Sequence, residues 1–362
     1  MTARQAFLKI HLCMGLAAAL FLIVLGLTGS VMAFENDIPH WLHRQLFYVH
    51  PAPQTLPEQD LVRIVEQRLA PAHVRAVQFF RQPDLARLMQ LDGGLTATVN
   101  PYDGTVLGSW QGPLAGDATL GFIHQLHLRL APDPRALPRW SPIGKQVISW
   151  AGALLCLLVP TGLILFWRTR RTTVKWSASW ARICFDAHHV VGVYAAAFLL
   201  VAALTGILIG FDWGEKAIYS ATHSRPPARQ VPVTSAVIPG ATPLTIDRAI
   251  DAARGAIPGT TVAGVLLPQS PKAVITVLLR VPEETSEAVH SSVLIDRYNG
   301  HVLQVHNFLI DSPGYRVIRF NRSIHTGDIF GTPTHIIVSI SSLLAVVMSV
   351  TGVVVWWRKL AV

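Results

Sequence analysis

Four long apolar stretches constrain the fold of this chain more than any other feature. They cover residues 10–34, 143–167, 187–211 and 335–357. Each is long enough to cross a membrane, since about 20 apolar residues span the hydrocarbon core as a helix. The chain has 362 residues, of which 14% are charged, whereas soluble domains contain about 25%. We therefore exclude a wholly soluble protein and expect four membrane helices with sizeable water-exposed parts.

The first stretch is expected to stay in the protein as a membrane anchor. It is longer than the apolar core of a signal peptide, and Glu35-Asn36-Asp37 follows it instead of small residues that a signal peptidase cleaves.

The distribution of charge predicts how these helices are oriented. The N-terminal tail, the segment 168–186 and the C-terminal tail together hold nine basic residues and one acidic residue, whereas the segments 35–140 and 212–330 hold twenty of each. Positively charged loops remain in the cytoplasm, so we expect both termini and the segment 168–186 there, with the two long segments on the far side. The net charge of +9 then reflects membrane orientation and does not predict nucleic-acid binding.

The chain contains an internal repeat. The first stretch carries a His, two Gly, a Thr and a Phe that recur 177 residues later in the third: His11, Gly15, Thr28-Gly29 and Phe34, against His188, Gly192, Thr205-Gly206 and Phe211. The second and fourth stretches both end in Thr-Gly-x4-Trp-Arg, 190 residues apart, and the segment 102–107 is similar to 298–303. Two units of the same topology predict a pseudo-two-fold axis along the membrane normal.

This repeat predicts the domain organisation. The fold class is a membrane protein with a bundle of four transmembrane helices, two parallel pseudo-repeats and two outer α+β modules. The expected parts are helix one at 1–34, the first module with an interfacial helix at 35–142, helix two at 143–167, a cytoplasmic loop at 168–186, helix three at 187–211, the second module at 212–333, and helix four with its tail at 334–362. Helices are predicted near 57–70 and 243–256. Strands are predicted near 74–80, 85–91, 95–99 and 105–107, and near 261–267, 273–280, 290–295 and 301–305.

Histidines at the membrane boundaries are the first candidates for function, because an ionisable residue in or near a membrane span is a functional candidate by default. His11 and His188 occupy matching positions at the cytoplasmic ends of helices one and three. A two-fold axis between them would let both imidazoles point at one object. Haem, a flat macrocycle with two axial positions, suits that arrangement.

A second set of histidines lies at the outer boundary. His124 and His127 precede helix two and share a helix face, and His325 precedes helix four at the corresponding place in the repeat. Either His124 or His127, together with His325, is a second candidate pair of haem ligands. His335, in the first turn of helix four, remains an alternative ligand.

Several other chemistries lack their motifs. The sequence has no GxGxxG motif after a strand, so it does not predict a nicotinamide or flavin domain. It also has no GxxxxGK[ST] motif, so it does not predict ATP binding. The three cysteines form no CxxC or zinc-binding pattern, and the CxxCH motif of covalent haem attachment is also missing. Any haem is therefore expected to be haem b, with its electrons supplied from outside the chain.

Together these motifs resemble the PepSY-associated transmembrane family, which includes ferric-siderophore reductases of bacterial inner membranes. The residues that carry the resemblance are the two His-x3-Gly motifs with their Thr-Gly pairs, His124-x2-His127, His325-Thr326-Gly327-Asp328-x2-Gly331 and the Thr-Gly-x4-Trp-Arg endings. The resemblance covers nearly the whole chain. It implies PepSY-like periplasmic modules and a core in the bacterial inner membrane with two haem b groups on His11, His188, His127 (or His124) and His325.

The resemblance also implies an oxidoreductase activity. Its substrate would be a ferric siderophore or another ferric chelate in the periplasm, and its electron donor a membrane quinol or a cytoplasmic donor. Two alternatives remain open. One is a non-catalytic protein whose PepSY-like modules bind or inhibit a protein partner, and the other is a permease for an iron chelate.

Overall fold

The computed structural model describes residues 2–131, 133, 135–170, 172–227, 232–238, 240–281 and 290–360. These residues form two compact units, and each unit is discontinuous in sequence. The helical unit comprises Met1–Glu35, Thr119–Arg225 and Pro313–Val362, and the sheet unit comprises Asn36–Ala118 and Pro226–Ser312. Arg171 of the predicted cytoplasmic loop lies outside the described residues.

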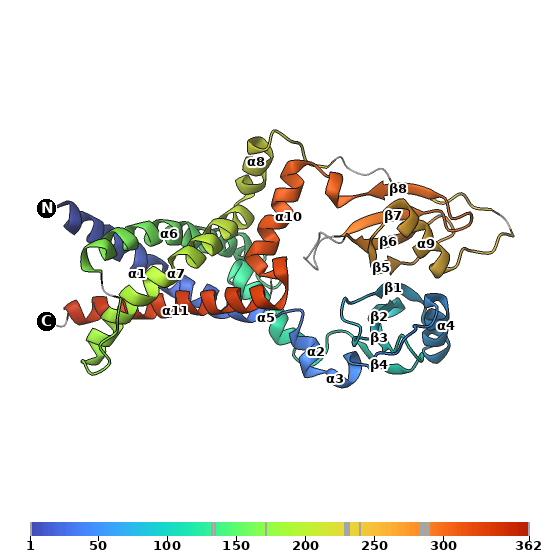
Figure 1. Ribbon diagram of the computed structural model, residues 1–362, viewed down its shortest axis with the longest axis horizontal. Helices are drawn as coiled ribbons and strands as arrows, with labels where there is room; N and C mark the ends of the chain where they lie inside the picture. The colour runs from blue at the N-terminus through green and yellow to red at the C-terminus, as the bar shows by residue number, and fades with distance from the viewer. Residues whose placement is uncertain are drawn as a thin grey trace. The chain divides into compact units, whose positions relative to one another are not determined.

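Four long apolar helices make up most of the helical unit: α1 (Ala3–Met32), α6 (Trp140–Thr169), α7 (Trp180–Gly210) and α11 (Thr332–Leu360) (Figure 1). Each is long and apolar enough to cross a membrane. All four begin several residues before the predicted apolar stretches, because polar and aromatic residues at a helix end need not lie in hydrocarbon. The Thr2 hydroxyl, for example, caps α1 by accepting a hydrogen bond from the Gln5 amide.

The four long helices pack so that α1 and α7, the equivalent helices of the two repeats, each contact both α6 and α11. Small residues allow close approach at these crossings, as is common for helices in lipid. A side chain at Gly26 of α1 would overlap the Ser342 carbonyl oxygen of α11, and one at Gly210 of α7 would overlap the Ser149 side chain of α6.

Three shorter helices also belong to the helical unit: α5 (Asp117–Arg129), α8 (Asp212–Ala221) and α10 (Pro313–Thr326). The sequence assigns all three to the outer segments 35–142 and 212–333, so those boundaries differ from the compact units of the structure. The reason is that α5 and α10 form hydrogen bonds with the long helices. On α10 the Asn321 side chain donates to the Thr205 carbonyl of α7, and on α5 the Arg129 side chain donates to the Ser141 hydroxyl of α6.

The sheet unit contains one antiparallel sheet of eight strands in the order β4-β3-β2-β1-β5-β6-β7-β8. The strands are β1 (Val74–Gln78), β2 (Arg87–Leu91), β3 (Leu95–Val99), β4 (Val106–Gln111), β5 (Thr261–Leu266), β6 (Ile275–Arg280), β7 (Ser291–Ile295) and β8 (Val302–His306). The sequence predicts these strands but divides them between two modules. Instead β1 pairs with β5, with Val77 opposite Val265. In the joined sheet neither β1 nor β5 is an exposed edge strand. In separate modules each would be an edge whose unpaired backbone groups could pair with another chain.

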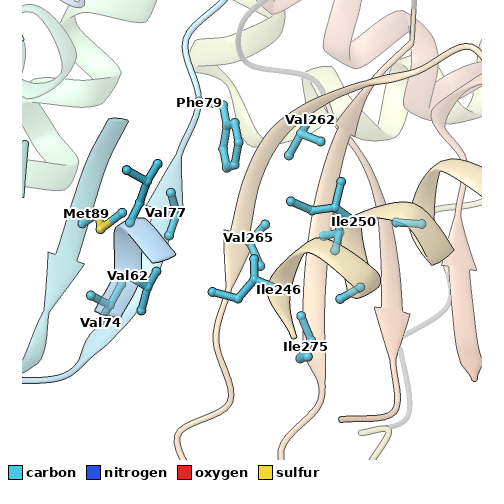
Figure 2. Packing of buried hydrophobic residues seen from close by; sticks show 14 of the residues in the cluster. Val62, Val74, Val77, Phe79, Met89, Ile246, Ile250, Val262, Val265 and Ile275 are labelled. Carbon is cyan, nitrogen blue, oxygen red and sulfur yellow. The ribbon is translucent and has the colours of Figure 1, made fainter. Parts of the chain in front are cut away.

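Two helices cover the sheet and supply much of its core: α4 (Glu58–Arg68) and α9 (Ile246–Ala256). Their buried residues recur at helical spacing, as with Leu61 and Val65 of α4 and Ile246 and Ile250 of α9. Figure 2 shows Val62 of α4 on the side of Val77, and Ile246 and Ile250 of α9 on the side of Val265. The core is therefore shared by both repeats.

The two covering helices also bond to each other at their N-termini. The Asp247 carboxylate of α9 accepts hydrogen bonds from the backbone amides of Glu58 and Gln59, and the Gln59 side chain accepts one from the Ile246 amide. These bonds satisfy amides that have no partner within their own helices.

The remaining elements are short. They are the helices α2 (Ile38–Leu42) and α3 (Arg44–Phe47) and the 3-10 helices η1 (Asp92–Gly94), η2 (Phe308–Ile310) and η3 (Asp328–Phe330). The repeat is visible in the strand connections. The Tyr102 hydroxyl donates to the Pro83 carbonyl, and the Tyr298 hydroxyl donates to the Pro271 carbonyl.

Candidate functional site

The structure brings the imidazole rings of His11 on α1 and His188 on α7 close together. Their ring centroids lie 6.4 Å apart, and the ring planes are inclined by 85°. The two residues come from diagonally placed helices, so they meet across the middle of the four long helices. We call this the inner pair.

Each histidine of the inner pair is oriented by a threonine from a neighbouring helix. His11 Nδ1 lies 2.9 Å from Thr161 Oγ1 of α6, and His188 Nδ1 lies 3.0 Å from Thr351 Oγ1 of α11. Both hydroxyls donate their own hydrogen to a carbonyl one turn earlier in their helix, so they accept from the imidazoles. Nδ1 therefore carries the proton, and the lone pair of each ring is on Nε2.

A second pair with the same construction is formed by His127 of α5 and His325 of α10. Their ring centroids also lie 6.4 Å apart, with an interplanar angle of 55°. His127 Nδ1 is 2.8 Å from Thr28 Oγ1 of α1, and His325 Nδ1 is 2.9 Å from Thr205 Oγ1 of α7. Both threonines donate to carbonyls of their own helices, so the lone pair is again on Nε2. We call this the outer pair.

The glycine that follows each of these threonines makes room for the imidazole ring. A Cβ atom at Gly29, Gly162 or Gly352 would lie 3.2 Å from the Cε1 atom of the facing histidine, and one at Gly206 would lie 3.1 Å from it. These distances are tighter than ordinary contact. In each long helix the Thr-Gly motif therefore contacts one histidine. The Thr hydroxyl accepts a hydrogen bond from Nδ1, and the Gly leaves space for the ring.

The two pairs lie at different depths along the long helices. His11 and Thr28, which contact different pairs, are seventeen residues apart on α1, and His188 and Thr205 are seventeen apart on α7. At 1.5 Å per residue the pairs are separated by about 25 Å along the helix axis. This separation is comparable to the thickness of the hydrocarbon core, roughly 30 Å.

Burial keeps the outer histidines neutral. It lowers the pKa of His127 to about 3, and it also lowers the pKa of His325. A neutral imidazole is the form that ligates a metal. Neutral imidazoles of this kind can ligate a metal without first losing a proton.

The other two candidate ligands of the outer site are His124 and His335, and both bond to carboxylates. His124 Nδ1 lies 2.7 Å from Glu35 Oε1, and this hydrogen bond is the main reason that the pKa of His124 is raised. His335 Nε2 lies 3.1 Å from Asp328 Oδ1. Of the histidines predicted for the outer site, His127 is the one that the structure brings opposite His325.

Both pairs fit a metal held between two axial nitrogens. With each Nε2 about 2 Å from the metal and about 1 Å from its own ring centre, the two ring centres are about 6 Å apart. The observed 6.4 Å agrees with this separation. Among the described residues no group of three or more His, Cys, Asp or Glu is arranged to hold a metal ion. Haem needs only two protein ligands, because the macrocycle supplies the remaining four nitrogens.

The role of the threonines could not be recognised from sequence analysis. The sequence shows one Thr-Gly in each of the four long helices and a fifth at Thr326-Gly327, but neighbouring residues do not reveal what such a motif contacts. Its signal was the fixed distance of seventeen residues from His11 to Thr28 and from His188 to Thr205.

Comparison with known proteins identifies the family. No curated protein sequence matches the chain. A family model described as the PepSY-associated TM region matches residues 8–359, which include nearly all of the four long helices, both histidine pairs and the eight-stranded sheet. A match of this extent means that the chain is a member of the PepSY-associated transmembrane family.

Proposed function

We propose that this protein is a haem-dependent oxidoreductase of the bacterial inner membrane that reduces a ferric chelate in the periplasm. The observation that carries the proposal is the pair of matched bis-histidine sites at two depths of the same helices. Each pair has a ring separation that suits two ligands of one metal, and in each ring Nδ1 is the nitrogen that bonds to threonine.

The histidines would hold two haem b groups, one between His11 and His188 and the other between His127 and His325. When bound, haem supplies one-electron redox chemistry at its iron. The threonines fix the tautomer and plane of each imidazole, which is the usual task of residues that bond to metal-ligating histidines. All four imidazoles are half-buried among the surrounding helices.

The direction of transfer follows from the charge distribution. Basic residues gather near the inner pair, so the inner pair is proposed to lie on the cytoplasmic side and the sheet unit in the periplasm. The reductant is a membrane quinol or a cytoplasmic donor. One electron converts one chelated Fe³⁺ into Fe²⁺, which hard oxygen ligands bind less strongly, so reduction promotes release of iron from a siderophore.

The alternatives have less support from the contacts. The permease interpretation depended on polar residues at the repeat interface, and the four repeated threonines are instead engaged by histidine rings. A non-catalytic protein that binds a protein partner does not require two pairs of closely spaced imidazoles, each bonded to a threonine through Nδ1. The redox interpretation is the one that uses them.

The decisive measurement is the absorption spectrum of the protein purified from haem-replete cells. We expect the spectrum of six-coordinate haem b and a pyridine haemochrome assay that gives two haems per chain. The anaerobically reduced protein should then be reoxidised by ferric siderophores, while ferrozine traps the Fe²⁺ that forms. A folded, colourless protein would refute the proposal. A haem protein that stays reduced with every ferric chelate would refute the reductase activity alone.

A further inference from the structure

The outer pair is flanked by two basic side chains at equivalent positions in the repeat. His124 lies three residues before His127 on α5, and Arg322 lies three residues before His325 on α10. Residues three apart on a helix share a face. His124 and Arg322 therefore each lie about one helical turn before a histidine of the outer pair, on the same face of the helix as that histidine.

The charges around the outer pair are not equally balanced. The Glu35 carboxylate bonds to His124, and the Asp328 carboxylate bonds to His335. Within the described part of the chain, the Arg322 guanidinium has neither a hydrogen bond nor an ion pair. Both nearby acids are thus committed to histidines, and Arg322 is left as an exposed cation.

Electrostatic coupling supports the placement of Arg322 near these groups. Its positive charge contributes to lowering the pKa of His124, of His325 and of Asp328. The guanidinium therefore lies within electrostatic reach of both sides of the outer site. Helix α10, which carries it, is held against α7 by the hydrogen bonds of Asn321 and His325 to Thr205.

We propose that the Arg322 guanidinium binds a propionate of the haem at the outer site. Haem b carries two carboxylates, and arginine recognises a carboxylate through two parallel charge-assisted hydrogen bonds. The equivalent position in the first repeat holds His124, whose charge is already balanced by Glu35. One haem propionate at the outer site would therefore pair with Arg322, a cation for which the described residues supply no acidic partner. This inference rests on the proposed function, because it requires haem at the outer pair.

The test is a spectroelectrochemical titration of the purified full chain, with Arg322→Gln compared to the wild type. Reduction adds a negative charge to the haem, so loss of a nearby cation disfavours reduction. We expect the equilibrium constant for reduction of the outer haem to fall about threefold to tenfold, where tenfold corresponds to about 59 mV for one electron. The inner haem, about 25 Å away along the helices, serves as the internal reference and should not change.

Two further variants separate charge from packing. Arg322→Lys keeps the charge and should restore most of the shift. Arg316→Gln removes an exposed cation from the same helix nine residues before His325, about 13 Å along the helix axis, and should leave both potentials unchanged.

The possible outcomes are distinct. Loss of the outer haem in Arg322→Gln but not in Arg322→Lys would also support the assignment. An unchanged outer potential in Arg322→Gln would overturn it, and so would loss of the outer haem in both variants. Absence of haem from the wild type would refute the proposed function itself, and that result is recognised before any variant is compared.

Discussion

Among single residues, Gly206 has little room to change, because its Cα faces the His325 ring. Gly206→Ala would place a methyl group 3.1 Å from His325 Cε1. We expect the ring to be displaced and the haem content to fall from two toward one per chain, as measured by pyridine haemochrome. Gly152→Ala is the control, since its Cβ would lie 3.8 Å from Ile207 Cγ1 in ordinary contact. Equal haem content in both variants would contradict the role assigned to the Thr-Gly motif.

The hydrogen bond between His124 and Glu35 predicts a pH-dependent contribution to stability. This bond raises the pKa of His124 above its ordinary value of 6.5, although burial and Arg322 oppose the shift. A raised pKa means that the contribution is fully present below the unfolded value and is lost as pH rises through the folded value. His124→Gln should therefore lower the thermal unfolding midpoint more at pH 6 than at pH 9, as followed by far-UV circular dichroism.

A control distinguishes this pair from a general effect of the substitution. Glu35→Gln should give the same pH pattern, and the double variant should lose little more than either single variant because both remove one interaction. A loss from His124→Gln that is the same at both pH values would mean that the pair is not charged in the folded protein.

At the scale of helices, the two histidine pairs should behave as independent sites. His11→Ala should remove or alter the inner haem only, and His325→Ala the outer haem only, because the pairs lie about 25 Å apart along the helices. Electron paramagnetic resonance can tell the two apart. The nearly perpendicular rings of the inner pair, at 85°, should give a more axial low-spin ferric signal than the 55° of the outer pair. If both variants lose the same signal, the assignment of depths is wrong.

Among the strands, a buried cation adds to the backbone pairing that joins the two repeats. Arg280 of β6 donates to the carbonyls of Val262 and Phe79, which belong to different repeats. Arg280→Met would leave both carbonyls without this donor at a cost of about 3 kcal/mol. Hydrogen exchange of the amides in β1 and β5 should become faster. The exposed Arg254, changed to Met, is the matched control and should leave the exchange of these strands unchanged.

For the whole molecule, the proposed orientation can be tested by labelling. After Cys13, Cys156 and Cys184 are changed to Ala, a single cysteine is introduced either at Ser109 in β4 or at Ser177 between α6 and α7. A maleimide that cannot cross membranes should label Ser109→Cys in intact spheroplasts. It should label Ser177→Cys only after lysis. The reverse pattern would place the sheet unit in the cytoplasm and contradict the proposed direction of electron transfer.

Much of this architecture could be predicted from local patterns in the sequence. The four apolar stretches, the helices near 57–70 and 243–256 and the eight strands all appear in the structure, with ends that differ by a few residues. Such elements are readable because hydrophobic periodicity acts over neighbouring residues. The repeat also predicted that His11 and His188 could point at one object, since equivalent positions lie at equal depth on opposite sides of a two-fold axis, and the structure brings the two rings together.

The tertiary structure alone decided what each candidate residue contacts. It joined β1 to β5 into one sheet, placed α5 and α10 with the membrane helices, and brought His127 rather than His124 opposite His325. Each histidine of a pair contacts a threonine that is 99 to 163 residues away in the chain. Local periodicity contains no information about partners at that distance. The sequence therefore determined which residues were available for the site, and the packing of helices determined which nitrogen of each ring bonds to a threonine and which does not.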